Sequence, residues 1–496
     1  MVTSTFAKFR LPRVATLDDL FGIDVRSLAL VRVSIGALIL YDLFVRAISL
    51  TEHYGDNGVF SSALIQSYWP FEYAWSLHLL AGGPLVVVVT CFIVHACATA
   101  ALLVGYKTRI ATFLTFMLQI SLYHANPILL YGVDDIIRTV LFVGIFLPWG
   151  AAYSFDSYFR QTASPHKRAL SMWTAAFLLQ LGFYYLFAAS TKIGPEWLDG
   201  SAVYYALSFI PDQTSLGVFM MQFPHLLTLA TFGVLILQSI ALILLFSPIF
   251  TMSLRLLALG ALIGMHASFG VLLQLGIFSW VAIAALLAFM PSFFWDAIEH
   301  YLGRNPPIAK TLKSEEQKTI FQALCEATAA MLGFLYIVYI FTWQASNSTF
   351  FQSDVHFPNG LVVVAKVLRI DQTSGLFAPS PPRSSGWYVI SGQLADGEEI
   401  DLLRDGAPAT YERSDSMEAV HRTYRVQSFM LNTMSWRYPE YRPTYAAYLC
   451  KKWNENNFES RRLLQVKLIY MAIETPEPGI PPSPVERVTL YEQTCS

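Results

Sequence analysis

Residues 226–247, LLTLATFGVLILQSIALILLFS, contain no charged side chain. As an α-helix this stretch would be about 33 Å long, enough to cross the roughly 30 Å hydrocarbon core of a bilayer. The whole chain has the same character, because 54% of its 496 residues are hydrophobic and only 14% are charged. Soluble domains usually carry about 25% charged residues. The sequence therefore indicates an integral membrane protein.

Eight other segments are long and apolar enough to be helical spans, which predicts a polytopic α-helical membrane protein of about nine spans. The first 27 residues lack the short apolar core and cleavage site of a signal peptide, so they are expected to form a cytoplasmic N-terminal segment. Residues 28–342 form the predicted transmembrane domain. Its nine spans are 28–49, 84–104, 109–125, 128–149, 170–191, 226–247, 252–272, 275–295 and 319–342.

The Lys and Arg residues of the loops predict the orientation. With nine spans, fourteen of these residues fall on one side of the membrane and one, Lys192, on the other. Cytoplasmic loops carry the excess of positive charge, so the N-terminus is expected in the cytoplasm and residues 343–496 outside. The formal net charge of −2 argues against a nucleic-acid partner, which would need a basic surface.

Residues 343–496 have an ordinary polar composition and predict a small extracytoplasmic α+β domain. Cys450 and Cys495 are its only cysteines, and they would form a disulfide in an oxidising compartment. The domain shows no metal-ligand spacing, no phosphate-binding loop and no paired nucleophile and base, which favours a cap or recognition role. The predicted elements are strands at 361–370, 463–473 and 486–494, a hairpin at 387–403 and a helix at 440–456.

Ionisable side chains inside the spans are expensive, at roughly 2.5–3.5 kcal/mol each on insertion scales, so they need a partner or a function. Asp42 and Arg46 have the i, i+4 spacing of a helical ion pair, and so do Asp134 and Arg138. One interpretation is interhelical ion pairs that fix the packing. The other is a polar chamber inside the membrane, to which Arg32 and His266 would also contribute.

Lys192 stands alone as the positive charge of the predicted outer loops. These loops, 50–83 and 192–225, are rich in aromatic residues and are expected to lie in the outer interface, where aromatic rings are favoured, and to cover a lipid-accessible cavity. A lysine desolvated there would have a lowered pKa and could act as a base. The alternative is a lysine that anchors a helix end by reaching to the headgroups.

At these same residues the chain resembles the HTTM (horizontally transferred transmembrane) family and the membrane part of the vitamin K-dependent gamma-glutamyl carboxylases. The resemblance covers roughly residues 20–300, and a tail pattern at 371–397 resembles bacterial HTTM proteins, which implies a bacterial inner or cell membrane. The motifs are FYYLFAASTKIGPEWLDGSAVYY at 183–205, MHASFGVLLQLGIFSW at 265–280, GYKTR at 105–109 and the series Arg32, Gly36, Asp42 and Arg46.

The resemblance implies roles for individual residues. Lys192, followed by an acidic residue and Trp197, occupies the place of the carboxylase lysine that deprotonates reduced vitamin K, so a reduced quinone is the implied cofactor. His266 aligns with a carboxylase histidine. Pro127, after Asn126, stands where the carboxylases have a histidine, and the tail differs from their lumenal region, so the implied chemistry concerns a quinol or other lipid. The implied chamber comprises Arg32, Asp42, Arg46, Asn126, Asp134, Arg138 and Trp197.

Two functions follow from these observations. The first is a membrane enzyme that abstracts a proton from, or does redox-coupled chemistry on, a lipophilic small molecule, with Lys192 and His266 as catalytic residues. The second is a non-enzymatic scaffold, or a maturation or export factor, whose outer domain docks a partner protein. The position of the Lys192 amine distinguishes them, since a base must be buried against a cavity.

Overall fold

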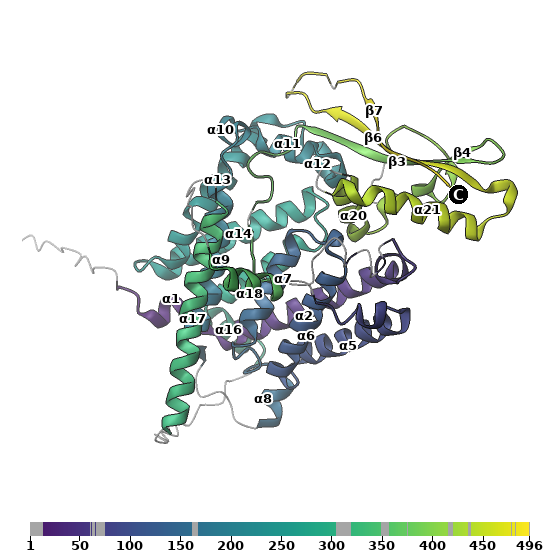
Figure 1. Cartoon of the computed structure of the whole chain (residues 1–496). Helices are drawn as coiled ribbons and strands as arrows, with labels where there is room; N and C mark the ends of the chain where they lie inside the picture. The colour runs from purple at the N-terminus through teal and green to yellow at the C-terminus, as the bar shows by residue number, and fades with distance from the viewer. Residues whose placement is uncertain are drawn as a thin grey trace, which may run out of the picture.

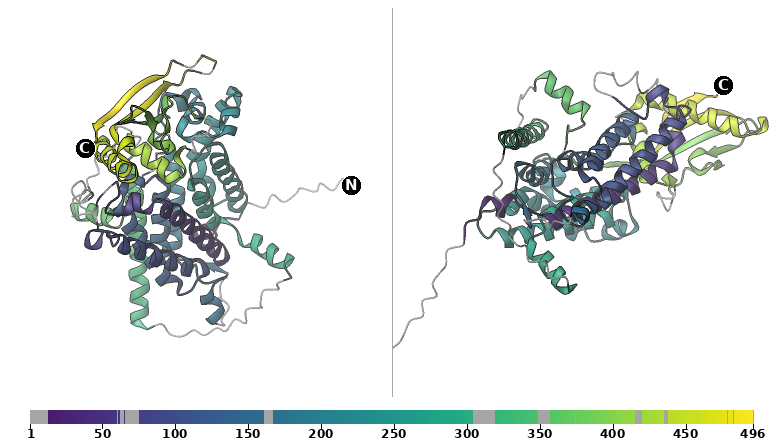
Figure 2. Two further views of the ribbon diagram at one scale, coloured as in Figure 1. Left: turned by 90° about the vertical axis from the view of Figure 1, so that its right-hand side faces the viewer. Right: turned by 90° about the horizontal axis from the view of Figure 1, so that it is seen from below.

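The computed structural model shows a helical bundle with a β-sheet at one end (Figure 1). Figure 2 shows the same arrangement from two further directions, with the yellow and light-green C-terminal strands and helices stacked on the bundle. The C-terminal residues are therefore packed against the helices. The structure describes residues 13–59, 61, 65, 75–160, 167–303, 319–348, 357–373, 375–414, 420–434, 438–477, 479–481 and 483–495.

Within these residues, six helices are long and apolar enough to cross a membrane, so the chain is an integral membrane protein. A seventh span is obtained if α15 and its 3-10 continuation, Phe278–Phe289, are joined to α16, Ser292–Tyr301, across a 93° bend. The six are α2 Val25–Ile48, α5 Leu85–Val104, α9 Met172–Ser190, α13 Pro224–Phe246, α14 Thr251–Leu272 and α17 Ile320–Ser346.

Three of the nine predicted spans are not among these six, and one of them, 275–295, falls in the bent pair of α15 and α16. The segment 109–125 is a helix, α6 Thr108–Ala125, but its buried face carries Thr112, Thr115 and Gln119, which lower its hydropathy. The segment 128–149 contains α7, Gly132–Gly144, whose 13 residues extend only about 20 Å. The count of nine is therefore not confirmed, and the sidedness derived from it stays a prediction.

Short helices connect the long ones. The predicted outer loop 192–225 folds into α10, α11 and α12, at the same end as the sheet (Figure 1). Trp197 and Tyr205 of this loop are buried, while Phe219 and Phe223 are about half exposed. In the other loop, Phe60, Tyr68, Trp69, Phe71 and Tyr73 lie outside the described residues. The short elements are α1 Leu17–Phe21, β1 Ile23–Asp24, α3 Leu50–Tyr54, α8 Phe155–Arg160, β2 Arg168–Ala169, α10 Pro195–Asp199, α11 Ala202–Ser208 and α12 Ser215–Met220.

The C-terminal region forms an antiparallel sheet in the order β5-β4-β3-β6-β7. The predicted hairpin, the helix at 440–456 and the last two strands are confirmed, with Gly397 in the left-handed conformation that the hairpin turn requires. The Cys450–Cys495 disulfide is also present and joins α21 to the end of β7. The elements are β3 Ser384–Leu394, β4 Glu399–Asp401, β5 Ala407–Pro408, α20 Tyr424–Met434, α21 Arg442–Asn456, β6 Leu463–Glu474 and β7 Glu486–Thr494.

The strand predicted at 361–370 is wrong, because this segment is the helix α18, Asn359–Val367. β-branched residues favour strands only where a neighbouring strand and a packing surface are available. Here Pro358 precedes the helix and its carbonyl accepts the first hydrogen bonds, while Ala365 packs inward with no exposed surface. The helix is followed by Arg369, Asp371 and Thr373, which line the cavity described below.

Candidate functional site: a cavity closed by the C-terminal region

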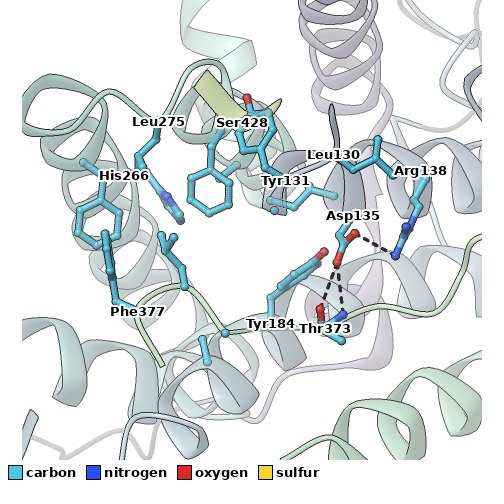
Figure 3. Close-up of a pocket in the computed structure, with 18 of the residues that line it drawn as sticks. Leu130, Tyr131, Asp135, Arg138, Tyr184, His266, Leu275, Thr373, Phe377 and Ser428 are labelled. Atoms are coloured by element: carbon cyan, nitrogen blue, oxygen red, sulfur yellow. Dashed lines mark hydrogen bonds and ion pairs between the residues drawn. The ribbon is translucent and has the colours of Figure 1, made fainter. Parts of the chain in front are cut away.

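A cavity of about 940 Å³ lies between the membrane helices and the C-terminal region. Its walls come from α7, α9, α13, α14 and α15, and from C-terminal residues within 366–373 and 375–377, α20 and Tyr438. Figure 3 shows His266, Leu275 and Phe377 on one side of this space and Asp135, Arg138 and Thr373 on the other. The C-terminal residues thus complete a site that the membrane helices leave open.

Lys192 lies at the wall of this cavity, two residues after α9 ends. Its side chain is only 5% exposed. The Nζ atom donates to the Ala188 carbonyl at 3.0 Å and lies 5.2 Å from the centre of the Trp197 ring. No carboxylate of the described residues is within ion-pair distance of it. Burial lowers the pKa of Lys192 to about 8, because the ammonium form has lost its hydration.

The segment that carries Lys192 and Trp197 is held by the C-terminal region. The Gly194 amide donates to the Pro379 carbonyl at 2.9 Å, and the Trp197 indole Nε1 donates to the Phe377 carbonyl at 3.0 Å. The Arg383 guanidinium pairs with Glu196 at 2.7 Å. These three contacts fix the turn after α9, so the position of the lysine depends on the C-terminal chain.

His266, on α14, faces the same cavity. Its Nε2 is 3.0 Å from the Tyr185 hydroxyl on α9, and its ring lies about 6 Å from the rings of Phe269 and Phe278. The other ring nitrogen, Nδ1, has no hydrogen-bond partner among the described residues. The pair of His266 and Tyr185 therefore offers one free imidazole nitrogen in an aromatic environment.

The opposite wall of the cavity is polar. Asp135 Oδ1 pairs with Arg138 Nη2 at 2.9 Å, and Asp135 Oδ2 is 3.4 Å from the amide and hydroxyl of Thr373 (Figure 3). The hydroxyls of Tyr131 and Tyr184 are buried and have no partner among the described residues. The cavity thus has an apolar aromatic side and a side that can form hydrogen bonds.

A buried cluster of four charged residues lies beside this site. Arg46 contacts Asp42 at 2.8 Å and Asp134 at 3.1 Å. Arg425 of α20 contacts Asp42 at 2.7 Å and binds Asp134 through two nitrogens at 2.8 and 2.9 Å. All four side chains are at most 2% exposed. Two acids and two bases balance, so the cluster fixes α2, α7 and α20 together.

The predicted Asp42–Arg46 pair is confirmed, and the predicted Asp134–Arg138 pair is wrong. Asp134 faces α2 and α20, where two guanidinium groups converge on it. Arg138 instead pairs with Asp135 and donates to the Asp371 carbonyl at 2.6 Å. The i, i+4 spacing shows which residues can meet on one helix but not which stronger partners come from other elements.

The nine predicted site residues fall in four places. Lys192, His266, Arg138 and Trp197 line the cavity, while Asp42, Arg46 and Asp134 belong to the charged cluster. Asn126 starts the turn before α7, where it accepts from the Ile128 amide and donates to the His53 carbonyl. Arg32 donates to the carbonyls of Leu102 and Tyr153, in contact with the loop before α8.

The C-terminal contributors were missed by the sequence analysis. Arg425 lies in the polar tail, where a single arginine carries no pattern that would link it to a carboxylate 291 positions earlier. Arg369 lies within the segment predicted as a strand, 361–370, and Asp371 follows it directly. Tyr184 and Tyr185 belong to the motif at 183–205. Their helical spacing from Lys192 was the sequence signal that could have placed them in the site. No three His, Cys, Asp or Glu side chains of the described residues are grouped as metal ligands.

The comparisons with known proteins agree with the helical part of this description. The model of the HTTM domain family matches residues 22–295, which is more than half of the chain and includes α2 to α15, Lys192 and His266. No curated protein and no solved structure matches the chain. The residues after 295, which supply Arg425 and the segment 366–377, lie outside the matched range. The chain belongs to the HTTM-domain family of membrane proteins.

Proposed function

We propose that the protein is a membrane enzyme that abstracts a proton from a lipophilic substrate bound in the cavity, with Lys192 as the base. The observation that carries this proposal is the burial of the Lys192 amine at the cavity wall without a carboxylate partner among the described residues. A lysine with a pKa of about 8 is partly neutral near physiological pH, and the neutral amine has a lone pair that can accept a proton.

The other side chains support this role. The neutral Nζ atom takes the proton of a substrate hydroxyl, and the ammonium that forms can bond the Ala188 carbonyl and face the Trp197 ring. His266, held by Tyr185, can donate to or accept from a substrate oxygen through Nδ1. Phe269, Phe278 and the C-terminal segment exclude water from this side, which favours proton transfer between fixed groups.

A reduced quinone fits the residues present. When bound, it supplies two weakly acidic hydroxyl groups on an aromatic ring. The cavity volume of about 940 Å³ accommodates such a ring with part of an isoprenoid chain. The buried hydroxyls of Tyr131 and Tyr184 and the Nδ1 atom of His266 have no partner among the described residues and can bond its oxygens.

The orientation forms part of the proposal. The distribution of Lys and Arg supports an N-terminus in the cytoplasm. The Cys450–Cys495 disulfide supports an oxidising compartment for the C-terminal region. The cavity lies at the end of the bundle next to that region (Figure 1), so a substrate would reach it from the outer leaflet of a cell membrane.

The first experiment is lipid extraction and mass spectrometry of the purified full-length protein and its Lys192→Ala variant. A matched control is Lys107→Ala, because Lys107 also stands at a helix end with its Nζ over an aromatic ring, at 5.7 Å from Tyr106, but is exposed. We expect a quinone or other isoprenoid to copurify with the wild type and the control and to be lost or altered in Lys192→Ala.

A second variant separates binding from proton transfer. Lys192→Arg keeps a positive charge, but arginine does not deprotonate in proteins. The variant protein should therefore still bind the lipid but be unable to abstract a proton from it. The proposal fails if no specific lipid is found in any sample. It also fails if the Lys192→Arg protein abstracts the proton from the bound lipid as the wild type does. The remaining function is then a scaffold or maturation factor with the C-terminal region as its docking surface.

A further inference from the structure

Two arginines from distant parts of the chain share the polar wall of the cavity. Arg138 comes from α7, and Arg369 follows α18 in the C-terminal region. Arg138 is 2% exposed and uses Nη2 for its contacts with Asp135 and Asp371, while its Nε and Nη1 atoms have no partner among the described residues. Arg138 therefore keeps two buried donor atoms free beside the cavity.

Arg369 has fewer contacts still. The described residues give its guanidinium no hydrogen bond and no ion pair, and its Nε atom is buried without a partner. Burial and then the positive charge of Arg138 lower the pKa of Arg369, so the two cations lie within electrostatic reach of each other. Its backbone has φ of 50°, in the left-handed region that is unfavourable for a non-glycine residue.

Two guanidinium groups, those of Arg138 and Arg369, line the cavity together with two carboxylates, Asp135 and Asp371. Both carboxylates contact Arg138, so Arg369 is the guanidinium that has no partner among the described residues. A buried charge without a compensating partner costs several kcal/mol, and two like charges beside each other add to that cost. An oxyanion would remove it, because guanidinium groups bind carboxylates and phosphates through paired N–H donors.

The other side of the cavity sets the rest of the ligand. Phe269, Leu275 and Phe278 line it with apolar surface, and Figure 3 places Leu275 and His266 across the space from Arg138. A molecule that fills both sides must have an acidic group and an apolar body. We propose that Arg138 and Arg369 form an anion-binding subsite that holds the carboxylate or phosphate group of an amphiphilic ligand in this cavity.

This inference deepens the proposed function, because it names a chemical group of the molecule bound in the cavity. It rests on the proposed function only in that both place a ligand in the same cavity. The test measures equilibrium binding of three probes with the same chain, dodecanoate, dodecyl phosphate and dodecanol, to the full-length protein in a neutral detergent. We expect the wild type to bind at least one anionic probe tenfold or more tightly than dodecanol, and the preferred anion identifies the source of the oxyanion.

Arg369→Gln is the decisive variant, because this side chain forms no hydrogen bond or ion pair with the described residues, so its loss should not disturb folding. This variant should weaken the binding of the anionic probes about tenfold and leave the binding of dodecanol unchanged. Arg462→Gln, an exposed arginine of the same region, serves as the control and should change neither. Equal binding of anion and alcohol by the wild type, or equal effects of Arg369→Gln and Arg462→Gln, would overturn the subsite.

The two proposals fail separately. Lys192→Ala should abolish proton transfer and keep the preference for the anionic probe over dodecanol. A protein that keeps this preference but tolerates Lys192→Arg has the subsite and lacks the proposed base. A protein that loses turnover in Lys192→Arg but shows no preference for anions has the base and lacks the subsite.

Discussion

At the scale of single residues, the pKa of Lys192 gives a stability test that needs no substrate. Its folded pKa of about 8 lies below the ordinary 10.5 because of burial. Below pH 8 the native protein holds the ammonium at the full cost of desolvation, which is on the order of 3 kcal/mol for this difference. Between pH 8 and 10.5 the unfolded chain binds more protons than the native one, so stability rises with pH in that window.

Lys192→Met should therefore raise the melting temperature at pH 7, because it keeps the apolar stem and removes the buried charge. The gain should shrink as the pH is raised from 8 towards 10, since the wild-type lysine is then neutral. Thermal unfolding in detergent across this pH range measures it. Lys107→Met is the control and should have no effect, and equal melting temperatures of the two variants at pH 7 would contradict the burial of Lys192.

At the scale of elements, α20 joins the C-terminal region to the bundle through Arg425. Removing this guanidinium leaves Asp42 and Asp134 with only Arg46, and an uncompensated buried charge typically costs about 3–5 kcal/mol. Arg425→Met should lower the unfolding free energy by this amount, measured by denaturant titration. Arg422 lies three residues before Arg425 and forms an exposed ion pair with Asp405. Arg422→Met should lower the unfolding free energy by less than about 1 kcal/mol.

The double variant Arg425→Met with Asp134→Asn checks the cause. Asparagine removes the excess negative charge, so part of the lost stability should return. A double variant more stable than the sum of the two single changes is expected, because Arg425 and Asp134 are in direct contact. If the destabilisation of the double variant equals or exceeds that sum, the effect of Arg425 comes from packing rather than from charge.

The elements also show which sequence signals are reliable. Each predicted span contains a helix, because an apolar stretch of this length has few alternatives. The strands β6 and β7 and the hairpin were predicted from alternation and from Asp396-Gly397. The helix α18 was not predicted, because its valines favour a strand locally. Its helical conformation is seen only in the packed chain, where Ala365 is buried. Asp134 was assigned the wrong partner for a similar reason, since Arg425 is distant in sequence.

At the scale of the whole molecule, the Cys450–Cys495 disulfide closes a loop of 45 residues around α21, β6 and β7. Replacing both cysteines by serine should lower the unfolding free energy by about 2–4 kcal/mol, largely because the unfolded chain regains freedom. Thermal unfolding of the double variant measures this loss, with reduced wild-type protein expected to match it. A variant as stable as the wild type purified from cells without reductant would contradict a stabilising disulfide at this position.

The candidate site could be predicted only in part, because it is assembled from two regions of different character. Lys192, His266 and Trp197 were found because charged or polar groups are rare in apolar segments. Arg369 and Asp371 lie in a polar tail where such residues are common and carry no signal. The closed cavity is a property of the packed chain, since its C-terminal wall follows from contacts such as that of Trp197 with Phe377.

The late position of Arg425 has a consequence for biosynthesis. The ribosome completes Asp42, Arg46 and Asp134 first, and these three leave one excess negative charge within the inserted helices. The compensating arginine is 291 residues further on, which at usual elongation rates means roughly 15–60 s of translation. During this interval α2 and α7 cannot reach their final packing. A chain that terminates before α20 would keep one buried carboxylate without its guanidinium partner, so the packing of α2 and α7 depends on a residue that is synthesised well after both helices.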